Sequence, residues 1–342
     1  TFFRHFPNHG FVGDIFTVTG MAYPVMYVKR RKYRLRFLDA SISRIYDLKL
    51  MKGTPKAAKD MGYTGDELQG QWRLQNAQQC MKMYECCNEG GMLPSLIERD
   101  SFELWPAKRR EVVVDFTKHM DGSATSSGEE IYLVNSMKMT TGRMWDAADP
   151  KYMVPLMKIV ITDDAPDNSL PGVDLAKPES RATVKLRQVP TLWDGAAAAV
   201  NDRSIPTFEL QRGSSSLSPE TEWLINGLAF DPEKPLARPY QTPEGGAGEV
   251  WRIRNGGGGW VHPFHLHMEE HQVLQRNGKA APDKRHPDDT GKEDVIALDP
   301  SEEVVIARRF RTFTGPYVAH CHNLAHEDHN MMYGWEIRPP AA

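Results

Sequence analysis

The chain lacks long apolar segments and has no large excess of charge of either sign. No stretch of about 18 apolar residues occurs, so the sequence predicts no membrane-spanning helix. The formal net charge of the 342 residues is −3, which gives no electrostatic reason to expect nucleic acid or an anionic membrane as a partner. Small molecules and other proteins remain as partners.

Cysteine is scarce, with four residues in the whole chain. Cys80, Cys86 and Cys87 lie close together and could form one local disulfide, Cys80 with Cys86 or Cys87, or stay as thiols. Cys321 differs because a histidine flanks it on each side. The chain also has no Asn-x-Ser/Thr motif, so N-glycosylation gives no support for a eukaryotic secretory route.

Short β-rich runs, separated by Gly, Pro, Asn and Asp, fill most of the chain. Several of them alternate polar with apolar residues, and long periodic helices are missing. This pattern predicts an all-β protein made of β-sandwiches. Residues 60–89 interrupt this pattern, and we expect an insertion or an irregular loop there. The expected strands lie at residues 33–38, 112–116, 131–134, 158–162, 183–187, 249–253 and 303–307.

A crowding of Asp, Pro, Asn and Gly at residues 163–178 predicts a linker. The linker would separate a first β-domain, residues 11–162, from a second, residues 179–342, and residues 1–10 would form an N-terminal tail. The chain begins with Thr1 instead of Met. Either a leader has been removed or the start is an internal point of a longer polypeptide, and we expect the second.

Nine of the 12 histidines lie between residues 262 and 329, most of them in two clusters. The first cluster reads His262-Pro-Phe-His265-Leu-His267, and the second begins His320-Cys321-His322. Residues two apart in a strand share a face, whereas residues an odd number apart lie on opposite faces. Strand geometry therefore predicts two separate sets of side chains. One is His262 with Cys321, and the other is His265, His267, His320 and His322.

The smaller set gains two further donors from the residues that follow Cys321. His326 comes five residues later and Met331 ten residues later. Two imidazoles, a thiolate and a weak thioether are the ligands of a blue-copper electron-transfer site, whereas structural zinc sites rarely include Met. The four imidazoles of the other set suit copper that binds oxygen. We expect ordinary structural roles for the remaining histidines, His5, His9, His119, His271, His286 and His329.

The two clusters resemble the last two copper-binding motifs of multicopper oxidases, and in particular of the branch with bilirubin oxidases, spore-coat laccases and manganese oxidisers. The string His-Cys-His-Asn-Leu-Ala-His-Glu-Asp-His-Asn-Met-Met at residues 320–332 is similar to the last motif of that branch. Weaker similarity covers residues 31–44 and 109–116. The resemblance implies tandem cupredoxin-like Greek-key β-sandwiches, the middle and C-terminal domains of the family.

The resemblance also implies a role for each donor. His262, Cys321 and His326 would hold a type 1 copper with Met331 as the axial ligand. His265 would bind a type 2 copper, and a type 3 pair would be bound by His267, His320 and His322.

Three residues beside these ligands have expected roles of their own. Trp260 resembles the tryptophan that bilirubin oxidases place beside the type 1 ligands, and Glu327 resembles an acid that helps to deliver protons to the cluster. A packed aromatic ring and a solvated carboxylate are the plain structural alternatives. Asp294 is a candidate hydrogen-bond partner of a ligand imidazole.

The chain departs from the family pattern in one respect. The family completes its oxygen-reducing cluster with four histidines from two His-x-His motifs in an N-terminal domain, and no such pair occurs here outside the two clusters. We therefore expect half of the cluster ligands in this chain. We expect the N-terminal domain to be a separate polypeptide, a cleaved piece or lost.

The resemblance implies an oxidase that takes single electrons from a phenolic, tetrapyrrole or metal-ion donor and reduces O2 to water by four electrons. We expect it to be extracellular or periplasmic. The main alternative is a blue-copper electron-transfer module without oxidase activity. A copper nitrite reductase fits less well, because that family lacks the double His-x-His arrangement.

Overall fold

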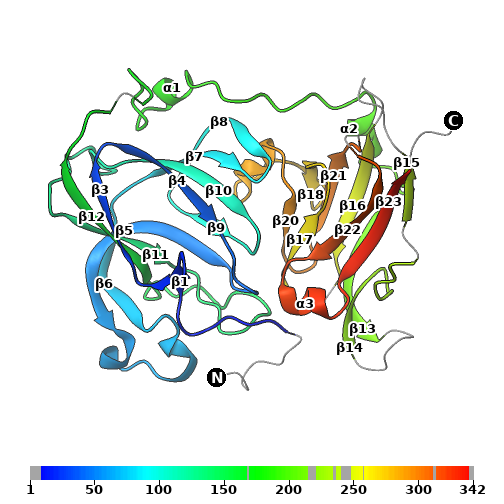
Figure 1. Cartoon of the computed structure of the whole chain (residues 1–342), viewed down its shortest axis with the longest axis horizontal. Helices are drawn as coiled ribbons and strands as arrows, with labels where there is room; N and C mark the ends of the chain where they lie inside the picture. The colour runs from blue at the N-terminus through cyan, green and yellow to red at the C-terminus, as the bar shows by residue number, and fades with distance from the viewer. Residues whose placement is uncertain are drawn as a thin grey trace.

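The computed structural model describes residues 9–167, 169–214, 221–233, 236–239, 248–256, 258–310 and 313–338. Residues 1–8, which hold His5 and most of the expected tail, lie outside the described residues. Two groups of β-sheets lie side by side, one from residues 17–164 and the other from residues 207–338 (Figure 1). The longest described α-helix, α3 (Leu324–Asp328), has five residues. The all-β class predicted from the sequence is confirmed.

The first sandwich packs a sheet of order β4-β10-β7-β8 on a sheet of order β3-β12-β11-β5-β6, with β9 paired to β5. Burial alternates along β10, so Val112 and Val114 enter the core between the sheets while Glu111 points away from it. A short β1-β2 hairpin precedes these strands. The strands are β1 (Thr17–Val18), β2 (Met21–Ala22), β3 (Val25–Arg30), β4 (Lys32–Leu38), β5 (Tyr46–Ala57), β6 (Trp72–Gln79), β7 (Met83–Asn88), β8 (Gly91–Arg99), β9 (Phe102–Leu104), β10 (Arg109–Asp115), β11 (Glu130–Asn135) and β12 (Val154–Asp164).

The second sandwich packs a sheet of order β14-β13-β16-β21-β18-β19 on a sheet of order β15-β23-β22-β17-β20. Its core includes Trp251, Phe264 and Trp335, and Cys321 and Met331 belong to the same buried cluster. The strands are β13 (Thr207–Ser214), β14 (Thr221–Ile225), β15 (Leu236–Pro239), β16 (Glu249–Asn255), β17 (His262–Leu266), β18 (Gln272–Arg276), β19 (Lys279–Ala280), β20 (Val295–Leu298), β21 (Glu303–Arg308), β22 (Gly315–Cys321) and β23 (Met332–Arg338).

Six of the seven strands expected from the sequence coincide with β4, β10, β11, β12, β16 and β21. The strand expected at residues 183–187 was wrong: this segment crosses β8 as an extended connection, where Leu186 N donates to Pro94 O, and it forms no ladder. The irregular loop expected as one alternative for residues 60–89 was also wrong. Two 3-10 helices, η2 (Ala58–Met61) and η3 (Gly65–Leu68), lead there into β6, and β7 follows as a central strand of its sheet.

The connection between the sandwiches extends beyond the expected linker. No strand occurs among the described residues between β12 and β13, and this stretch carries only α1 (Pro178–Arg181) and α2 (Ala196–Ala199). It runs along one side of both sandwiches (Figure 1). The division into residues 11–162 and 179–342 stays a prediction.

Buried ion pairs join the two sandwiches. Arg110 of β10 lies 2.7 Å from Glu85 of β7 and 2.5 Å from Asp288, which belongs to η4 (Pro287–Thr290) of the second sandwich. Lys108 Nζ reaches Glu293 at 2.9 Å. Because every one of these side chains is buried, each charge depends on its partner for compensation. The sandwiches are thereby fixed against each other next to the segment that leads into β20.

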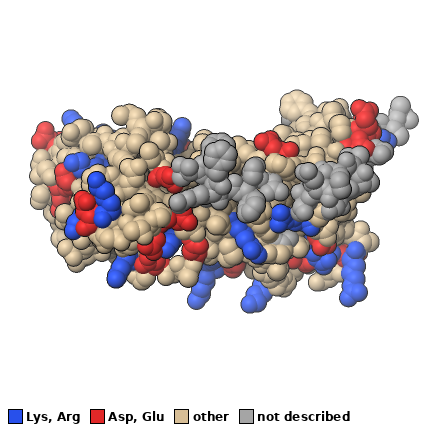
Figure 2. Space-filling view, turned by 90° about the horizontal axis from the view of Figure 1, so that it is seen from below, with Lys and Arg blue, Asp and Glu red and all other residues tan. Residues whose placement is uncertain are grey.

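The outer surface carries both signs of charge. Figure 2 shows Lys and Arg interspersed with Asp and Glu on the face that it presents. In the described part of the chain, none of the helices has the length and apolar character needed to cross a membrane.

Candidate metal centre

The pairing of β17 with β22 sorts the histidines by face. Phe264 lies opposite Cys321, and His265 lies opposite His320. Directly opposed residues in a ladder share a face, and Phe264 lies in the core. Cys321 therefore points into the core, as does His262, which lies two residues before Phe264. His265 and His320 point away from the core. The register agrees with the two sets that the sequence predicts.

Three donor atoms converge on the core side of these strands. Cys321 Sγ lies 3.4 Å from His262 Nδ1 and 3.5 Å from His326 Nδ1, and the two Nδ1 atoms are 3.2 Å apart. All three side chains are fully buried. One ion could contact all three atoms, because they lie within 4.8 Å of one another.

The loop after β22 brings His326 and Met331 back to this site. Asn323 caps α3 by accepting from Ala325 N, and its Nδ2 lies 3.0 Å from His326 Nε2. Met331 is tied in by two backbone hydrogen bonds, one that Cys321 N donates to Met331 O and one that Met331 N donates to His326 O. The Met331 side chain is fully buried in the same core cluster as Cys321.

Burial keeps these donors uncharged. It lowers the pKa of His262 to about 3 and holds the pKa of His326 well below its usual range. It also raises the pKa of the Cys321 thiol. Neutral imidazoles suit metal binding without further change, whereas the thiol must lose its proton to an incoming ion. His262 Nε2, the ring nitrogen other than the Nδ1 that faces Cys321, is buried and has no hydrogen-bond partner among the described residues.

Four imidazoles gather on the opposite face of the same strands. His267 Nε2 lies 3.2 Å from His320 Nε2, and the ring centres of His265 and His320 are 5.4 Å apart. His322 lies with its ring centre 5.5 Å from that of His320. The first three rings offer nitrogen atoms within 4.8 Å of one another, and His322 lies just outside this group.

Two acidic residues, Asp294 and Glu327, flank the imidazole group. Asp294 accepts through its backbone oxygen from His265 Nδ1 at 2.8 Å, and Glu327 Oε2 lies 3.0 Å from His320 Nδ1. When Nδ1 of each ring is engaged in this way, its Nε2 is left for a metal. Burial alone would raise the pKa of Glu327, but the contact with His320, together with the nearby His322 and His267, lowers the pKa of this carboxyl.

The electrostatics of the imidazole group also favour neutral rings. Burial, followed by the neighbouring His265 and His320, lowers the pKa of His267 to about 4. Burial and His320 lower the pKa of His322 as well. His267 and His322 therefore offer unprotonated ring nitrogens that can bind cations at neutral pH.

Tryptophans cover the core-side site on the side of β14. Trp223 stacks on His326 with ring centres 3.8 Å apart, and Trp260 lies edge-on to Trp223 at 5.0 Å. Trp260 is 5.7 Å from His326 and buried, and the guanidinium of Arg143 lies over it at 5.4 Å. Trp260 was predicted from the sequence, whereas Trp223 lies about 100 residues before His326 in the chain and belongs to no motif that would predict it.

The remaining described histidines lie outside both groups. His286 contacts Asp283, His329 Nδ1 contacts Ala325 O, and His119 lies 3.2 Å from Glu129. The His9 ring packs edge-on against Trp260, with ring centres 4.6 Å apart. His271 is buried and pairs through its backbone with Glu293.

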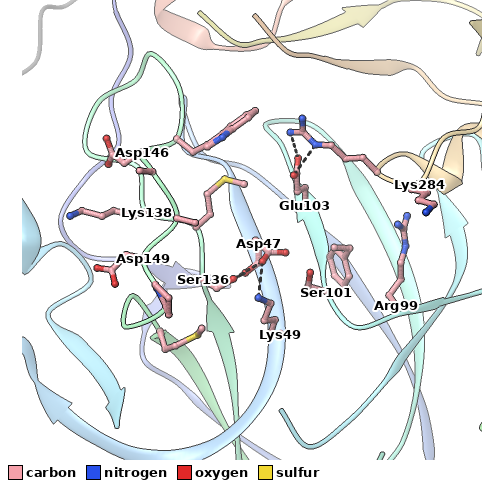
Figure 3. A pocket seen from close by; sticks show the side chains of 18 residues that line it. Asp47, Lys49, Arg99, Ser101, Glu103, Ser136, Lys138, Asp146, Asp149 and Lys284 are labelled. Carbon is pink, nitrogen blue, oxygen red and sulfur yellow. Dashed lines mark hydrogen bonds and ion pairs between the residues drawn. The ribbon is translucent and has the colours of Figure 1, made fainter. Parts of the chain in front are cut away.

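A separate pocket of about 600 Å³ opens between β5, β9 and the Lys284–Arg285 turn (Figure 3). Its charges are largely compensated, because Asp47 contacts Ser136 and Lys49, and Glu103 contacts Arg285. None of its lining residues belongs to either histidine group.

The structure resolves the question of the cysteines. Cys80, Cys86, Cys87 and Cys321 are all free and buried. Cys80 lies in the core of the first sandwich, with its thiol near Leu50 O, whereas Cys86 faces Glu111. A disulfide between Cys80 and either neighbour is therefore not formed.

Comparison with known proteins agrees with this geometry. Residues 201–341 match the family model described as multicopper oxidase. The bilirubin oxidase of Albifimbria verrucaria is 29% identical over 327 residues, which cover 95% of this chain and 48% of that protein. Residues 201–341 thus match the multicopper oxidase family, and nearly the whole chain is similar to a bilirubin oxidase. The laccase of Bacillus subtilis is also 29% identical, over 96% of this chain and 55% of its own length.

Solved structures of similar fold cover nearly the whole chain. McoA of Aquifex aeolicus matches 97% of the chain with a TM-score of 0.67 at 23% identity, and a multi-copper oxidase of Pediococcus acidilactici matches 99% with a TM-score of 0.65 at 24%. The chain covers 61% and 56% of these two structures. The cupredoxin fold expected from the sequence is confirmed. The chain spans about half the length of the curated relatives that it matches.

Copper is the metal that this homology supports for the His and Cys groups. The donor sets fit it, because a buried thiolate with two imidazoles and a nearby thioether suits blue copper, and a cluster of imidazoles suits a second copper centre.

Proposed function

We propose that this chain provides the electron-accepting copper site and half of the oxygen-reducing cluster of a laccase-like or bilirubin oxidase-like enzyme. His262, Cys321 and His326 would hold the type 1 copper, with Met331 as the axial donor. His265 would bind a type 2 copper, and a type 3 pair would be bound by His267, His320 and His322. The observation that carries the proposal is the convergence of the Cys321 thiol with two Nδ1 atoms within 3.5 Å.

Bound copper would supply one-electron oxidation of a donor at the first site and four-electron reduction of O2 to water at the second. The protein supplies a covalent connection between them, because Cys321 is joined by peptide bonds to His320 and His322. The side chains of Cys321 and His320 point to opposite faces of β22. The two sites are thus separated by the thickness of one strand.

The chain's other residues hold the ligands and handle protons. Asp294 fixes His265 through Nδ1, and Glu327 does the same for His320. Because the pKa of Glu327 is lowered, it is an ionised carboxylate at neutral pH and can accept a proton at the edge of the cluster. We propose that Glu327 relays protons there.

Two aspects of the proposal concern what lies around the chain. The four imidazoles are half the number of histidines that the family uses for its cluster. We propose that the other half is supplied by further residues of the same polypeptide or by a partner. Phenols, tetrapyrroles and oxidisable metal ions are the donor classes to test, and we propose an extracellular or periplasmic location. Trp260 and Trp223 would separate the donor from the type 1 ligands.

The test is O2 uptake by the copper-loaded protein in its complete form, with a phenol and with bilirubin as donors. The proposal predicts donor-dependent O2 uptake without accumulation of peroxide, and its loss in Cys321→Ser. Reversible reduction of a blue copper with no O2 uptake in the complete protein would instead leave an electron-transfer module.

A further inference from the structure

A second group of sulfur donors lies in the first sandwich, away from the histidine clusters. Cys86 and Cys87 are adjacent in β7, and their thiols lie with the Glu111 carboxylate within 4.8 Å of one another. Both cysteines are buried. Adjacent residues of a regular strand would point to opposite faces, so this proximity needs a structural cause.

A β-bulge is the cause. Glu111 lies opposite Cys87 and Val112 lies opposite Glu85, so Cys86 is an extra residue in β7 without a counterpart in β10. A bulge of this kind turns two successive side chains toward the same side of the sheet. Val112 points into the core, and therefore Glu111 and both thiols lie on the outer face. Cys86 Sγ also donates to Glu111 O at 3.4 Å.

A methionine side chain, that of Met92, lies on the same face as the two thiols. Met92 of β8 is the ladder partner of Cys87, so its side chain lies beside that of Cys87. Met92 is 46% exposed, which gives the buried thiols an open edge. Thiolates and a thioether together favour soft ions such as Cu(I), whereas structural zinc usually needs four Cys, His or carboxylate ligands.

Charge also favours a monovalent ion. Glu111 is already paired, with Arg34 Nε at 2.5 Å and Arg36 Nε at 3.3 Å. Two thiolates with one cuprous ion carry a single negative charge, and the carboxylate with its two guanidinium groups carries a single positive charge. The assembled group is neutral, and the two thiolates are its buried part, because the Arg34 and Arg36 side chains are 45% and 74% exposed. A divalent ion would leave an excess positive charge.

We propose that Cys86 and Cys87 form a binding site for a cuprous ion, with Met92 as an additional weak donor. Binding forms two copper–sulfur bonds, releases the two thiol protons to solvent and leaves the copper as Cu(I), so no oxidant or reductant is consumed. Two sulfurs on one ion stand at most about 4.6 Å apart, twice a metal–sulfur distance of about 2.3 Å. The observed limit of 4.8 Å therefore requires little movement of the strand.

The test is a Cu(I) titration of the full chain under anaerobic conditions against a chromophoric Cu(I) chelator. All samples carry Cys321→Ser, which removes the other cysteine of a candidate site. Cys86→Ser and Cys87→Ser are compared with Cys80→Ser, a buried free thiol on the core side of the same sandwich. We expect Cys80→Ser to bind one Cu(I) more than either of the other two variants. Equal binding by all three would overturn the proposal.

A spectroscopic measurement covers the case in which a serine variant does not fold. The chain with Cys321→Ser alone is loaded with one equivalent of Cu(I), and X-ray absorption at the copper edge identifies the neighbouring atoms. The proposal predicts sulfur neighbours at about 2.3 Å. A shell of nitrogen atoms only would place the ion on histidines and would contradict the proposal.

Discussion

Arg109 and Asp294 form a two-armed ion pair that joins the first sandwich to the imidazole cluster. Arg109 Nη1 donates to Asp294 Oδ1 at 2.8 Å and Nη2 donates to Oδ2 at 2.6 Å. The backbone oxygen of Asp294 accepts from His265 Nδ1. The orientation of a proposed copper ligand thus depends on a residue that lies 156 positions earlier in the chain than that ligand.

Arg109→Gln removes the positive partner of Asp294 while keeping a polar side chain. Because Arg109 is 37% exposed, solvent screens the pair, and we expect a loss of unfolding free energy on the order of 1 kcal/mol. Urea denaturation measures it. We also expect weaker copper binding at the imidazole cluster. Arg254→Gln, which breaks an exposed pair with Glu303, is the matched control and should change neither quantity appreciably.

The same pair predicts a pH dependence. Burial alone would raise the pKa of Asp294, but its contacts with His265 and Arg109 hold this pKa well below the ordinary 3.8. A depressed pKa stabilises the fold above the unfolded pKa and loses that contribution as the pH falls toward the folded pKa. The stability difference between wild type and Arg109→Gln should therefore be constant at neutral pH and shrink below about pH 4. A difference that grows on acidification would contradict this role.

The buried network around Arg110 should be far more sensitive to substitution. Arg110→Met leaves Glu85 and Asp288 with less compensation in the interior, and we expect a loss of about 3–5 kcal/mol in urea unfolding. Arg338→Met breaks the exposed pair with Glu336 and should change the stability by less than about 0.5 kcal/mol. Similar losses of unfolding free energy in both variants would show that the buried network stabilises the fold no more than an exposed ion pair does.

The sequence alone predicted those features that depend on residues close together in the chain. The alternation of polar and apolar residues predicted β10, and the spacing of His320, Cys321 and His322 predicted which of these side chains share a face. Both predictions hold because successive side chains in a regular strand point to opposite faces. The bulge at Cys86 breaks that parity and could not be read from the residues. β7 was missed because six buried residues in succession, MYECCN, show no alternation.

Contacts between residues that are distant in the sequence could not be predicted. Trp223 and Arg109 reach their sites only through tertiary packing, and no spacing rule links them to a histidine. Asn323 carried a local signal that was overlooked, since an Asn directly before a helical turn is a typical N-cap. Residues 183–187 alternate as a strand does, but pairing with a neighbouring strand decides whether an extended segment joins a sheet.

Trp223 should report copper at the core-side site through its fluorescence. Its ring stacks on His326 at 3.8 Å, so a paramagnetic ion held by that imidazole should quench it strongly. We expect Cu(II) to quench the wild type and Trp223→Phe to lose part of that change, because Trp260 also lies 5.7 Å from His326. Trp72→Phe, at a partly exposed tryptophan of the first sandwich, should keep it. Equal quenching in both variants would place the ion elsewhere.

Glu327→Gln tests the proposed proton relay. The amide retains the shape of the side chain but cannot accept and release protons, so O2 turnover by the copper-loaded complete protein should fall by about 100-fold. Reduction of the type 1 copper by donor should be unchanged, because Glu327 contacts His320 of the other site. Asp328→Asn, at the next residue of α3, is the control and should leave turnover unaffected. An equal loss in both reactions would indicate a structural role instead.

The most direct measurement is a Cu(II) titration of the purified chain followed by visible absorption and by copper stoichiometry. A thiolate–copper site at Cys321, His262 and His326 predicts an intense blue band that saturates with copper, disappears in Cys321→Ser and persists in Cys80→Ser. Copper binding without a blue band, or a band that survives in Cys321→Ser, would contradict the proposed type 1 site and with it the oxidase function.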